Sequence, residues 1–258
     1  MPRAAGTVVL LHGFTGAPAS WDDVAALLGP GAAVVRPALL GHGDEADDLA
    51  ADFAGEVDRI AARLPRAGSA PLHLVGYSLG ARVALGLLAR HPERFSRATL
   101  IGVHPGLTGA GERAARVDSD ERWAQRLEEG GIAAFVDAWQ RQALLEPASP
   151  LDERRLARQR QVRLSHRAAG LSRSLRVLGL GRMPDYRQAL GACAVPLRLV
   201  VGAADRRFTA LAEEIRRLQP RAALSVVEGA GHNVPLEQPA RVAALLDESQ
   251  HPQQGATP

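Results

Sequence analysis

The chain has 258 residues, of which 46% are hydrophobic and 23% charged, and its 31 basic residues only slightly outnumber its 28 acidic ones. This composition excludes disorder over most of the length, and a core of this size, with or without an inserted lobe, can bury about 70–75% of its unfolded surface. The single cysteine, Cys193, excludes an internal disulfide, so we expect a reducing compartment and a small buried side chain at that position.

The N-terminal segment leaves no room for a secretory signal ahead of the first apolar run. Residues 1–6 lead directly into Thr7–Leu11 and then into His12-Gly13. No later apolar run approaches the length that crosses a bilayer. We therefore expect a cytoplasmic protein without a membrane span. The net charge of +3 is too small to indicate a nucleic-acid partner, and nothing in the pattern indicates an oligomeric state.

Short runs rich in aliphatic and β-branched residues alternate with helical patterns. The predicted strands are Thr7–Leu11, Ala32–Arg36, Leu72–Val75, Thr99–Val103, Leu197–Val201 and Leu224–Val227. An apolar stripe at helical spacing follows the second strand and consists of Leu49, Phe53, Val57, Ile60 and Leu64. Further helices are predicted at Leu79–Arg90, Thr209–Leu218 and Gln238–Glu248. This alternation predicts an α/β fold with a mostly parallel central sheet flanked by helices.

The alternation stops between about residue 105 and residue 192. That stretch has no convincing strand, and its predicted helices are Asp118–Glu129, Ile132–Leu144, Asp152–Leu164 and Gly170–Leu178. We therefore expect a core formed by residues 1–105 and 192–248, with residues 106–191 inserted as a helical cap. The polar tail at residues 249–258 is expected to be disordered.

A candidate nucleophile follows the third predicted strand. Gly76-Tyr77-Ser78-Leu79-Gly80 fits the pattern G-x-S-x-G and lies between an apolar strand and a helix, where this motif forms a sharp turn that exposes the serine hydroxyl. The helix N-terminus beside Ser78 favours developing negative charge. A chance match is the alternative, and the placement of the motif argues against it.

A serine hydroxyl needs a histidine to take its proton and a carboxylate to orient that histidine. Asp205 follows the strand at Leu197–Val201, and His232 follows the strand at Leu224–Val227. The chain order Ser78, Asp205, His232 is the order that this architecture requires. Four further histidines stay possible neighbours of the site: His12, His42, His104 and His166.

The turn after the first strand supplies a fourth element. His12-Gly13-Phe14-Thr15-Gly16 resembles the segment whose backbone N–H, together with the N–H after the nucleophile, forms an oxyanion hole. Phe14 and Leu79 are the predicted donors. These elements in this order predict an α/β-hydrolase fold. No metal-binding spacing is present, and we expect no metal and no cofactor.

The predicted cap is rich in arginine. Between residues 147 and 190 there are ten arginines and three acidic residues, in a chain without lysine. A charged helical face is usually solvated, but a few arginines directed toward Ser78 would bind carboxylates in bidentate fashion. Arg82, one turn after Ser78, and Arg116, early in the cap, are candidates to join them. This indicates a small anionic substrate.

The cap sequence resembles one branch of the α/β hydrolases, the 2-succinyl-6-hydroxy-2,4-cyclohexadiene-1-carboxylate synthases of menaquinone biosynthesis. The likeness covers about residues 7–247. Its motifs are Gly76–Arg82, His104–Leu107, Glu112–Arg116, Asp118–Asp120, Arg122–Arg126, Gly202–Phe208, Gly231–Asn233 and Glu237–Pro239. The cap motifs are more specific than the segments around Ser78, Asp205 and His232.

The resemblance implies elimination of pyruvate from 2-succinyl-5-enolpyruvyl-6-hydroxy-3-cyclohexene-1-carboxylate, a polycarboxylate, with Ser78 as base and without a cofactor. It also implies a substrate-binding set formed by Tyr77, Arg82, Arg116, Trp139 and Arg163. A carboxylesterase or thioesterase that uses the same three side chains on a small anionic substrate is the alternative. A binding protein that kept the fold without activity is a weaker reading, because binding alone does not require these elements together.

Overall fold

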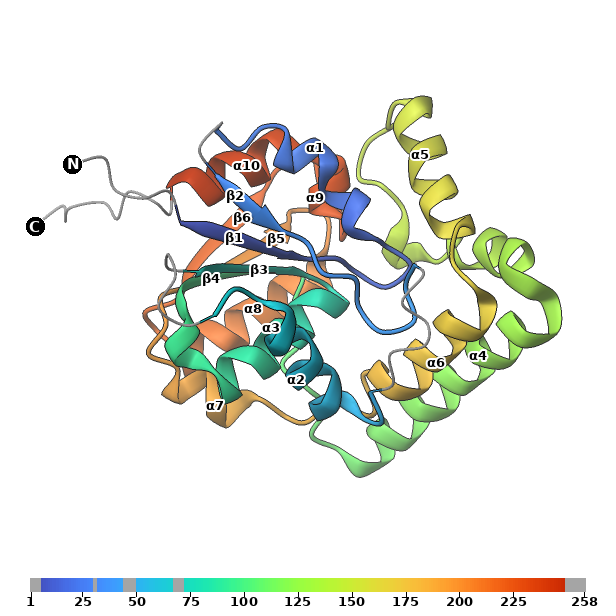
Figure 1. Cartoon of the computed structure of the whole chain (residues 1–258), viewed down its shortest axis with the longest axis horizontal. Helices are drawn as coiled ribbons and strands as arrows, with labels where there is room; N and C mark the ends of the chain where they lie inside the picture. The colour runs from blue at the N-terminus through green and yellow to red at the C-terminus, as the bar shows by residue number, and fades with distance from the viewer. Residues whose placement is uncertain (1–5, 30–31, 44–49, 67–71, 249–258) are drawn as a thin grey trace, which may run out of the picture.

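A computed structural model describes residues 6–29, 32–43, 50–66 and 72–248, and Figure 1 shows their arrangement. Within these residues the strands form one sheet in the order β2-β1-β3-β4-β5-β6. Their bounds are Thr7–Leu11 (β1), Ala33–Val35 (β2), Leu72–Tyr77 (β3), Phe95–Ile101 (β4), Leu197–Gly202 (β5) and Ala223–Val227 (β6). Every neighbouring pair is parallel, so all carboxyl ends lie at the same edge. The predicted α/β fold with a parallel sheet is confirmed.

Helices cover both faces of the sheet (Figure 1). One face carries α2 (Phe53–Arg63), α3 (Leu79–Arg90), α7 (Arg187–Ala192) and α8 (Arg206–Leu218). The other face carries α1 (Asp22–Ala25), α9 (Val234–Glu237) and α10 (Pro239–Glu248). Successive strand residues point to opposite faces. Leu11 and Leu74 therefore belong to the apolar core on the first face, and Leu10 and Val75 belong to the core on the second.

Three helices form a lobe beside the carboxyl edge of the sheet, namely α4 (Ala110–Trp139), α5 (Glu153–Leu164) and α6 (Ala168–Leu178). The lobe has a small apolar core of its own, to which Leu127, Phe135 and Leu171 belong. Helix α4 is kinked at Gly131, where φ is 72° and ψ is 177°. The kink turns the second half of α4 so that its aromatic side chains meet those of the first half. The exact limits of a cap domain stay a prediction.

The lobe meets the core most closely at two glycines. Gly41 has a φ of 78°, and a Cβ on it would overlap the carbonyl oxygen of Gly170 in α6. A Cβ on Gly170 would lie 2.6 Å from the carbonyl oxygen of Gly41. The two backbones therefore touch without a side chain between them, and α6 is held directly against the loop after β2.

Several predicted bounds differ from the structure. Strand β4 begins four residues before the predicted start, because Phe95, Ser96 and Arg97 lie on it although they lack an apolar pattern. Helix α4 begins at Ala110 instead of Asp118. Cys193 is half-buried rather than buried, so that expectation was wrong. Leu49 and the tail at residues 249–258 lie outside the described residues. In the described ranges no helix has the length and apolarity needed to cross a bilayer.

Candidate active site

Ser78 lies at the sharp turn between β3 and α3. Its φ of 52° is unusual for a residue other than glycine, and its N–H donates to the carbonyl oxygen of Ile101 at 2.9 Å. The turn brings α3 against the end of β1, where a Cβ on Gly80 would overlap the carbonyl oxygen of Leu11. The glycine of the sequence motif is thus required by close backbone approach. At this turn Ser78 lines a cavity together with His232.

Ser78, His232 and Asp205 form one chain of hydrogen bonds. His232 Nε2 is 3.1 Å from Ser78 Oγ, and His232 Nδ1 is 2.7 Å from Asp205 Oδ2. Asp205 also caps α8, because its Oδ1 accepts the N–H of Phe208 at 3.1 Å. Both of these side chains are buried, with Asp205 8% and His232 3% exposed. This geometry permits His232 to take a proton from Ser78 while Asp205 holds the imidazole in place.

The two residues predicted to supply the oxyanion hole, Phe14 and Leu79, line the same cavity as Ser78. Leu79 is the first residue of α3, so its N–H has no intrahelical acceptor. Phe14 lies in the turn after β1. Across the described residues neither N–H donates a hydrogen bond to the protein. Because these N–H groups are without a protein acceptor and lie in residues that line the cavity, the oxyanion hole stays a prediction consistent with this geometry.

That cavity has a volume of about 470 Å³ and opens between the sheet edge and the lobe. Arg82 and Arg116 line it, and the Arg116 Nε lies 2.9 Å from Asp120 Oδ1. Arg82 donates to the carbonyl oxygen of Leu178 at 2.7 Å, which links α3 to α6. Burial, with a smaller effect of Arg116, lowers the pKa of Arg82 to about 9, so Arg82 stays charged at neutral pH. Arg207 also lines this cavity, so three guanidinium groups accompany one carboxylate here, which favours an anionic ligand.

A second cavity, of about 290 Å³, adjoins the first and shares Phe14, Tyr77 and Leu145 with it. Arg163 of α5 lines this second cavity and is only 6% exposed. Among the described residues no carboxylate forms an ion pair with Arg163. Burial lowers the pKa of the Arg163 guanidinium and raises that of the Tyr77 phenol. A buried cation without a counter-ion is costly, so this position is suited to a bound carboxylate.

Many of the other lobe arginines are engaged at the surface. Arg158 contacts Asp23 of α1 at 3.2 Å, and Arg160 contacts Asp137 at 2.6 Å. Arg176 binds Glu121 and Glu128 of α4. These pairs join the lobe helices to one another and to the core. Arg155 and Arg158 line the second cavity as well, and Arg163 differs from them because it is buried.

The structure also lines the first cavity with side chains that were not singled out from the sequence. Trp123 packs against Trp139 with ring centroids 5.0 Å apart, and Trp139 packs against Phe14 at the same distance. Phe208 lies 4.3 Å from the His232 ring. Phe208 could have been predicted as a site residue from the sequence, because it follows Asp205 by three residues. The contact between Trp123 and Trp139 could not, because it depends on the kink in α4. In the described part of the chain, no cluster of three or more His, Cys, Asp and Glu side chains is arranged for a metal ion.

The four histidines predicted as neighbours of the site lie in two places. His104 lines the first cavity, and burial lowers its pKa to about 4. His12, His42 and His166 lie together behind the turn that carries Phe14. Apart from His42 and His166, every residue predicted for the site or beside it lines one of the two adjoining cavities or belongs to the hydrogen-bonded series Ser78, His232 and Asp205.

Comparison with known proteins agrees with this geometry. Residues 8–245 match the alpha/beta hydrolase family. The chain is 34% identical to the 2-succinyl-6-hydroxy-2,4-cyclohexadiene-1-carboxylate synthase of Enterobacter sp. (strain 638), over 93% of this chain and 89% of that protein. It is 33% identical to the protein of the same name from Salmonella newport (strain SL254), over 95% of each chain. The structure of MenH from S. aureus superposes with a TM-score of 0.90 at 25% identity, covering 95% of each chain. The chain thus belongs to the alpha/beta hydrolase family, within the group of 2-succinyl-6-hydroxy-2,4-cyclohexadiene-1-carboxylate synthases.

Proposed function

We propose that this chain eliminates pyruvate from 2-succinyl-5-enolpyruvyl-6-hydroxy-3-cyclohexene-1-carboxylate and releases 2-succinyl-6-hydroxy-2,4-cyclohexadiene-1-carboxylate, a step of menaquinone biosynthesis. The names of the relatives support the reaction. One observation carries the proposal. Ser78, His232 and Asp205 are joined by hydrogen bonds, and Ser78 and His232 line the same cavity as Arg82 and Arg116. The arginines that line this cavity outnumber its one carboxylate, Asp120, and this excess of positive charge suits a polycarboxylate better than a neutral ester.

The proposed reaction begins with proton transfer. His232 takes the Ser78 hydroxyl proton, and the Ser78 oxygen removes a proton from the carbon next to the succinyl carbonyl. The electron pair of the broken C–H bond moves onto the carbonyl oxygen, where the N–H groups of Phe14 and Leu79 stabilise the enolate. Collapse of the enolate breaks the carbon–oxygen bond to the enolpyruvyl group. The proton held by His232 passes to the departing pyruvate, which restores the starting state without water or a cofactor as reactant.

The substrate carries three carboxylates. Among the described residues six arginines line the two cavities, and the three predicted substrate ligands are Arg82, Arg116 and Arg163. Arg82 and Arg116 lie on the Ser78 side, and Arg163 lies beyond Tyr77 in the adjoining cavity. We propose that these cations bind the carboxylates, while Tyr77 and the Trp139 ring pack against the rest of the substrate. This arrangement would place the acidic C–H bond at Ser78 Oγ. The composition and the single cysteine further support a cytoplasmic location.

The test is pyruvate release from the enolpyruvyl substrate by the purified chain, followed in parallel with hydrolysis of a neutral short-chain aryl ester. We expect release that is lost in Ser78→Ala protein, with slow ester hydrolysis. Absence of pyruvate, combined with fast ester hydrolysis that does not respond to loss of Arg82, Arg116 or Arg163, would overturn the proposal. That result would favour an ester or thioester hydrolase that uses the same three side chains.

A further inference from the structure

Three buried histidines lie directly behind the turn that carries Phe14. The rings of His12 and His42 are 4.9 Å apart between centroids, and those of His42 and His166 are 5.2 Å apart. All three are at most 3% exposed. His12 and His42 belong to the core, whereas His166 lies between α5 and α6 of the lobe. None of them takes part in the proton transfers described above.

Two of these imidazoles hold the peptide groups of Thr15. The N–H of Thr15 donates to His42 Nε2 at 3.1 Å, and His166 Nε2 donates to the carbonyl oxygen of Thr15 at 3.2 Å. Thr15 has a φ of 62°, a conformation that a β-branched residue rarely adopts. Such a conformation persists only when its surroundings enforce it. The two histidines contribute to this, together with the hydrogen bond from the N–H of Gly16 to the carbonyl oxygen of Gly13 at 2.9 Å. Phe14 immediately precedes Thr15 in the turn.

The remaining ring nitrogens fix the protonation state of each imidazole. His42 Nδ1 donates to the carbonyl oxygen of Leu40 at 3.0 Å, and His166 Nδ1 accepts the N–H of Gly43 at 3.0 Å. His12 Nδ1 donates to the carbonyl oxygen of Gly13 at 2.9 Å, and its Nε2 accepts the N–H of Leu39 at 3.1 Å. Each ring thus donates through one nitrogen and accepts through the other, as only a neutral imidazole does. The required tautomers are Nδ1–H for His12 and His42 and Nε2–H for His166.

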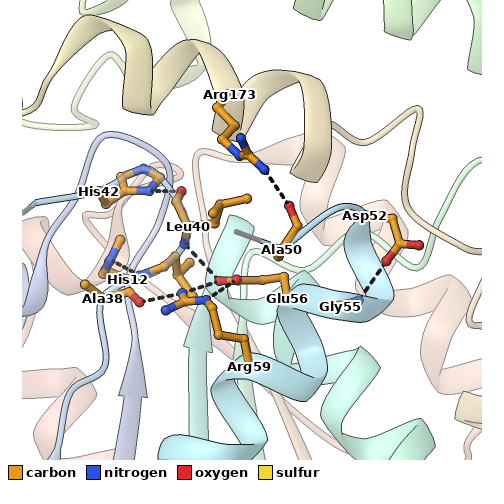
Figure 2. A network of polar contacts seen from close by, with 11 residues as sticks. His12, Ala38, Leu40, His42, Ala50, Asp52, Gly55, Glu56, Arg59 and Arg173 are labelled. Atoms are coloured by element: carbon orange, nitrogen blue, oxygen red, sulfur yellow. Dashed lines mark hydrogen bonds and ion pairs between the residues drawn. The ribbon is translucent and has the colours of Figure 1, made fainter. Parts of the chain in front are cut away.

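The loop that receives these bonds is anchored in turn to α2 (Figure 2). Glu56 is fully buried, and its Oε1 accepts the N–H of Leu40 at 2.9 Å. Arg59 binds Glu56 at 2.6 Å and donates to the carbonyl oxygen of Ala38 at 2.9 Å. The buried ion pair between Glu56 and Arg59 therefore fixes the loop against which the histidines are placed.

We propose that His42 and His166 are positioning residues that hold Thr15, and through it the N–H of Phe14, in the place required for an oxyanion hole. His12 supports them by joining the Gly13 carbonyl to the loop at Leu39. Because His166 belongs to the lobe, correct seating of the lobe completes the oxyanion site. The inference rests on the role of Phe14 in the proposed function.

Substitution of His42 or His166 by asparagine or by glutamine distinguishes a positioning role from a purely structural one. Glutamine at position 42 or 166 places its amide where Nε2 lies and preserves the bond to Thr15. Asparagine reaches only the place of Nδ1 and loses that bond. We expect His42→Asn and His166→Asn to lower kcat for pyruvate release by about tenfold or more, with KM changed less than twofold, since loss of a whole oxyanion donor costs roughly 10²–10³ in kcat. His42→Gln and His166→Gln should stay within about threefold of the unsubstituted rate, a margin well below that loss.

His73 provides the matched control. It is a buried histidine of β3 that binds Thr99 Oγ1 at 2.9 Å, away from the turn. His73→Asn should lower the melting temperature as the other variants do, while kcat stays unchanged. Equal kcat values for the Asn and Gln variants at positions 42 and 166, or a loss no larger than that of His73→Asn, would overturn the inference.

A measurement on the unsubstituted protein is independent of activity and of variant folding. Nitrogen-15 NMR of histidine-labelled protein at neutral pH should show two buried Nδ1–H rings and one Nε2–H ring assigned to His12, His42 and His166. A charged ring or the opposite tautomer at His42 or His166 would also overturn the inference. If the unsubstituted protein released no pyruvate, the proposed function would fail. The Asn and Gln variants would then be compared on ester hydrolysis, which needs the same oxyanion site.

Discussion

Ser78 shows how a single residue combines backbone strain with chemical function. Its positive φ costs on the order of 1–3 kcal/mol, and the close approach of α3 to β1 at Gly80 enforces it. In return, the hydroxyl leaves the plane of the sheet and reaches His232 Nε2. Thr15 is the other described residue apart from glycine with a positive φ, and it lies in the turn that faces Ser78. Both strained residues of the described chain are therefore at the site.

The three hydrogen-bonded side chains are expected to act as one unit. Ser78→Ala, Asp205→Asn and His232→Ala should each lower kcat by roughly 10⁴-fold, because the proton cannot be relayed when any member is missing. A double variant should lose little more than the worse single variant. Steady-state pyruvate release measures the rates, and circular dichroism confirms the fold. Near-normal turnover by Ser78→Ala protein would show that another group is the base.

Three arginines that line the two cavities are expected to determine affinity for the polycarboxylate. Replacing Arg82, Arg116 or Arg163 by Ala should remove a charge-assisted contact worth about 1.5–3 kcal/mol, which lowers kcat/KM by roughly tenfold to a hundredfold. Lysine should restore only part of the loss, since it cannot form a bidentate contact.

Arg176→Ala is the control for this series, because Arg176 binds Glu121 and Glu128 on the lobe surface and lines neither cavity. It should leave kcat/KM unchanged. An Arg163→Ala protein with unchanged kcat/KM would show that the second cavity does not receive a carboxylate of this substrate.

At the scale of elements, parallel strands bring the site together. The turn at Phe14 follows β1, Ser78 follows β3, Asp205 follows β5 and His232 follows β6. All four segments lie at the carboxyl edge because every strand pair is parallel. The lobe then covers this edge, and α4 and α5 contribute Arg116 and Arg163.

Much of this arrangement could be predicted from the sequence because the signals are local. Ser78, Asp205 and His232 each follow an apolar strand at short range, so a parallel topology alone brings them together. The start of α4 could not be predicted, because residues 110–117 have no clear apolar stripe. The direction of each arginine could not be predicted either. Arg163 and Arg176 belong to similar helices, and only tertiary packing places one at a cavity and the other against surface carboxylates.

The contact between α3 and β1 gives a test at this scale. Gly80→Val should destabilise the fold by more than about 3 kcal/mol or prevent folding, because even a Cβ would overlap Leu11 O. Gly111→Ala is the matched control, since a Cβ on this exposed glycine of α4 meets no atom within 4 Å. It should be neutral or slightly stabilising. Urea unfolding measures both, and a soluble Gly80→Val protein with normal stability would contradict the tight turn.

At the scale of the whole molecule, buried neutral histidines make stability depend on pH. Burial is the main cause of the lowered pKa in each case, and the groups are His12, His42, His73, His104 and His166. The pKa is lowered to about 4 for His12 and His104 and to about 3 for His73. An unfolded chain protonates these groups near pH 6.5. Their contribution to stability is therefore complete above that pH and is lost as the pH falls toward the native values.

Acid should accordingly unfold the protein over a narrow range. For each histidine that stays neutral in the native state, the free energy of unfolding falls by up to about 1.4 kcal/mol per pH unit below about 6.5. For these histidines together the fall is several kcal/mol per pH unit. The urea midpoint should be nearly constant from about pH 8 to 7 and fall steeply below about pH 6, given the unfolded pKa. His73→Asn should make this fall shallower by about 1.4 kcal/mol per unit, once its lower starting stability is subtracted. The account would be refuted if the urea midpoint at neutral pH equalled the midpoint measured one to two pH units below the histidine pKa of the unfolded chain.

The direct contact between Gly41 and Gly170 limits how such a protein can be recombined. The two positions are far apart in the chain, yet neither backbone leaves room for a side chain on the other. A chimera that takes its lobe from one relative and its core from another must therefore carry glycine at both junction points, whatever else it exchanges. Swapping lobes to change substrate preference is thus a problem of matching two backbones as well as of choosing new arginines.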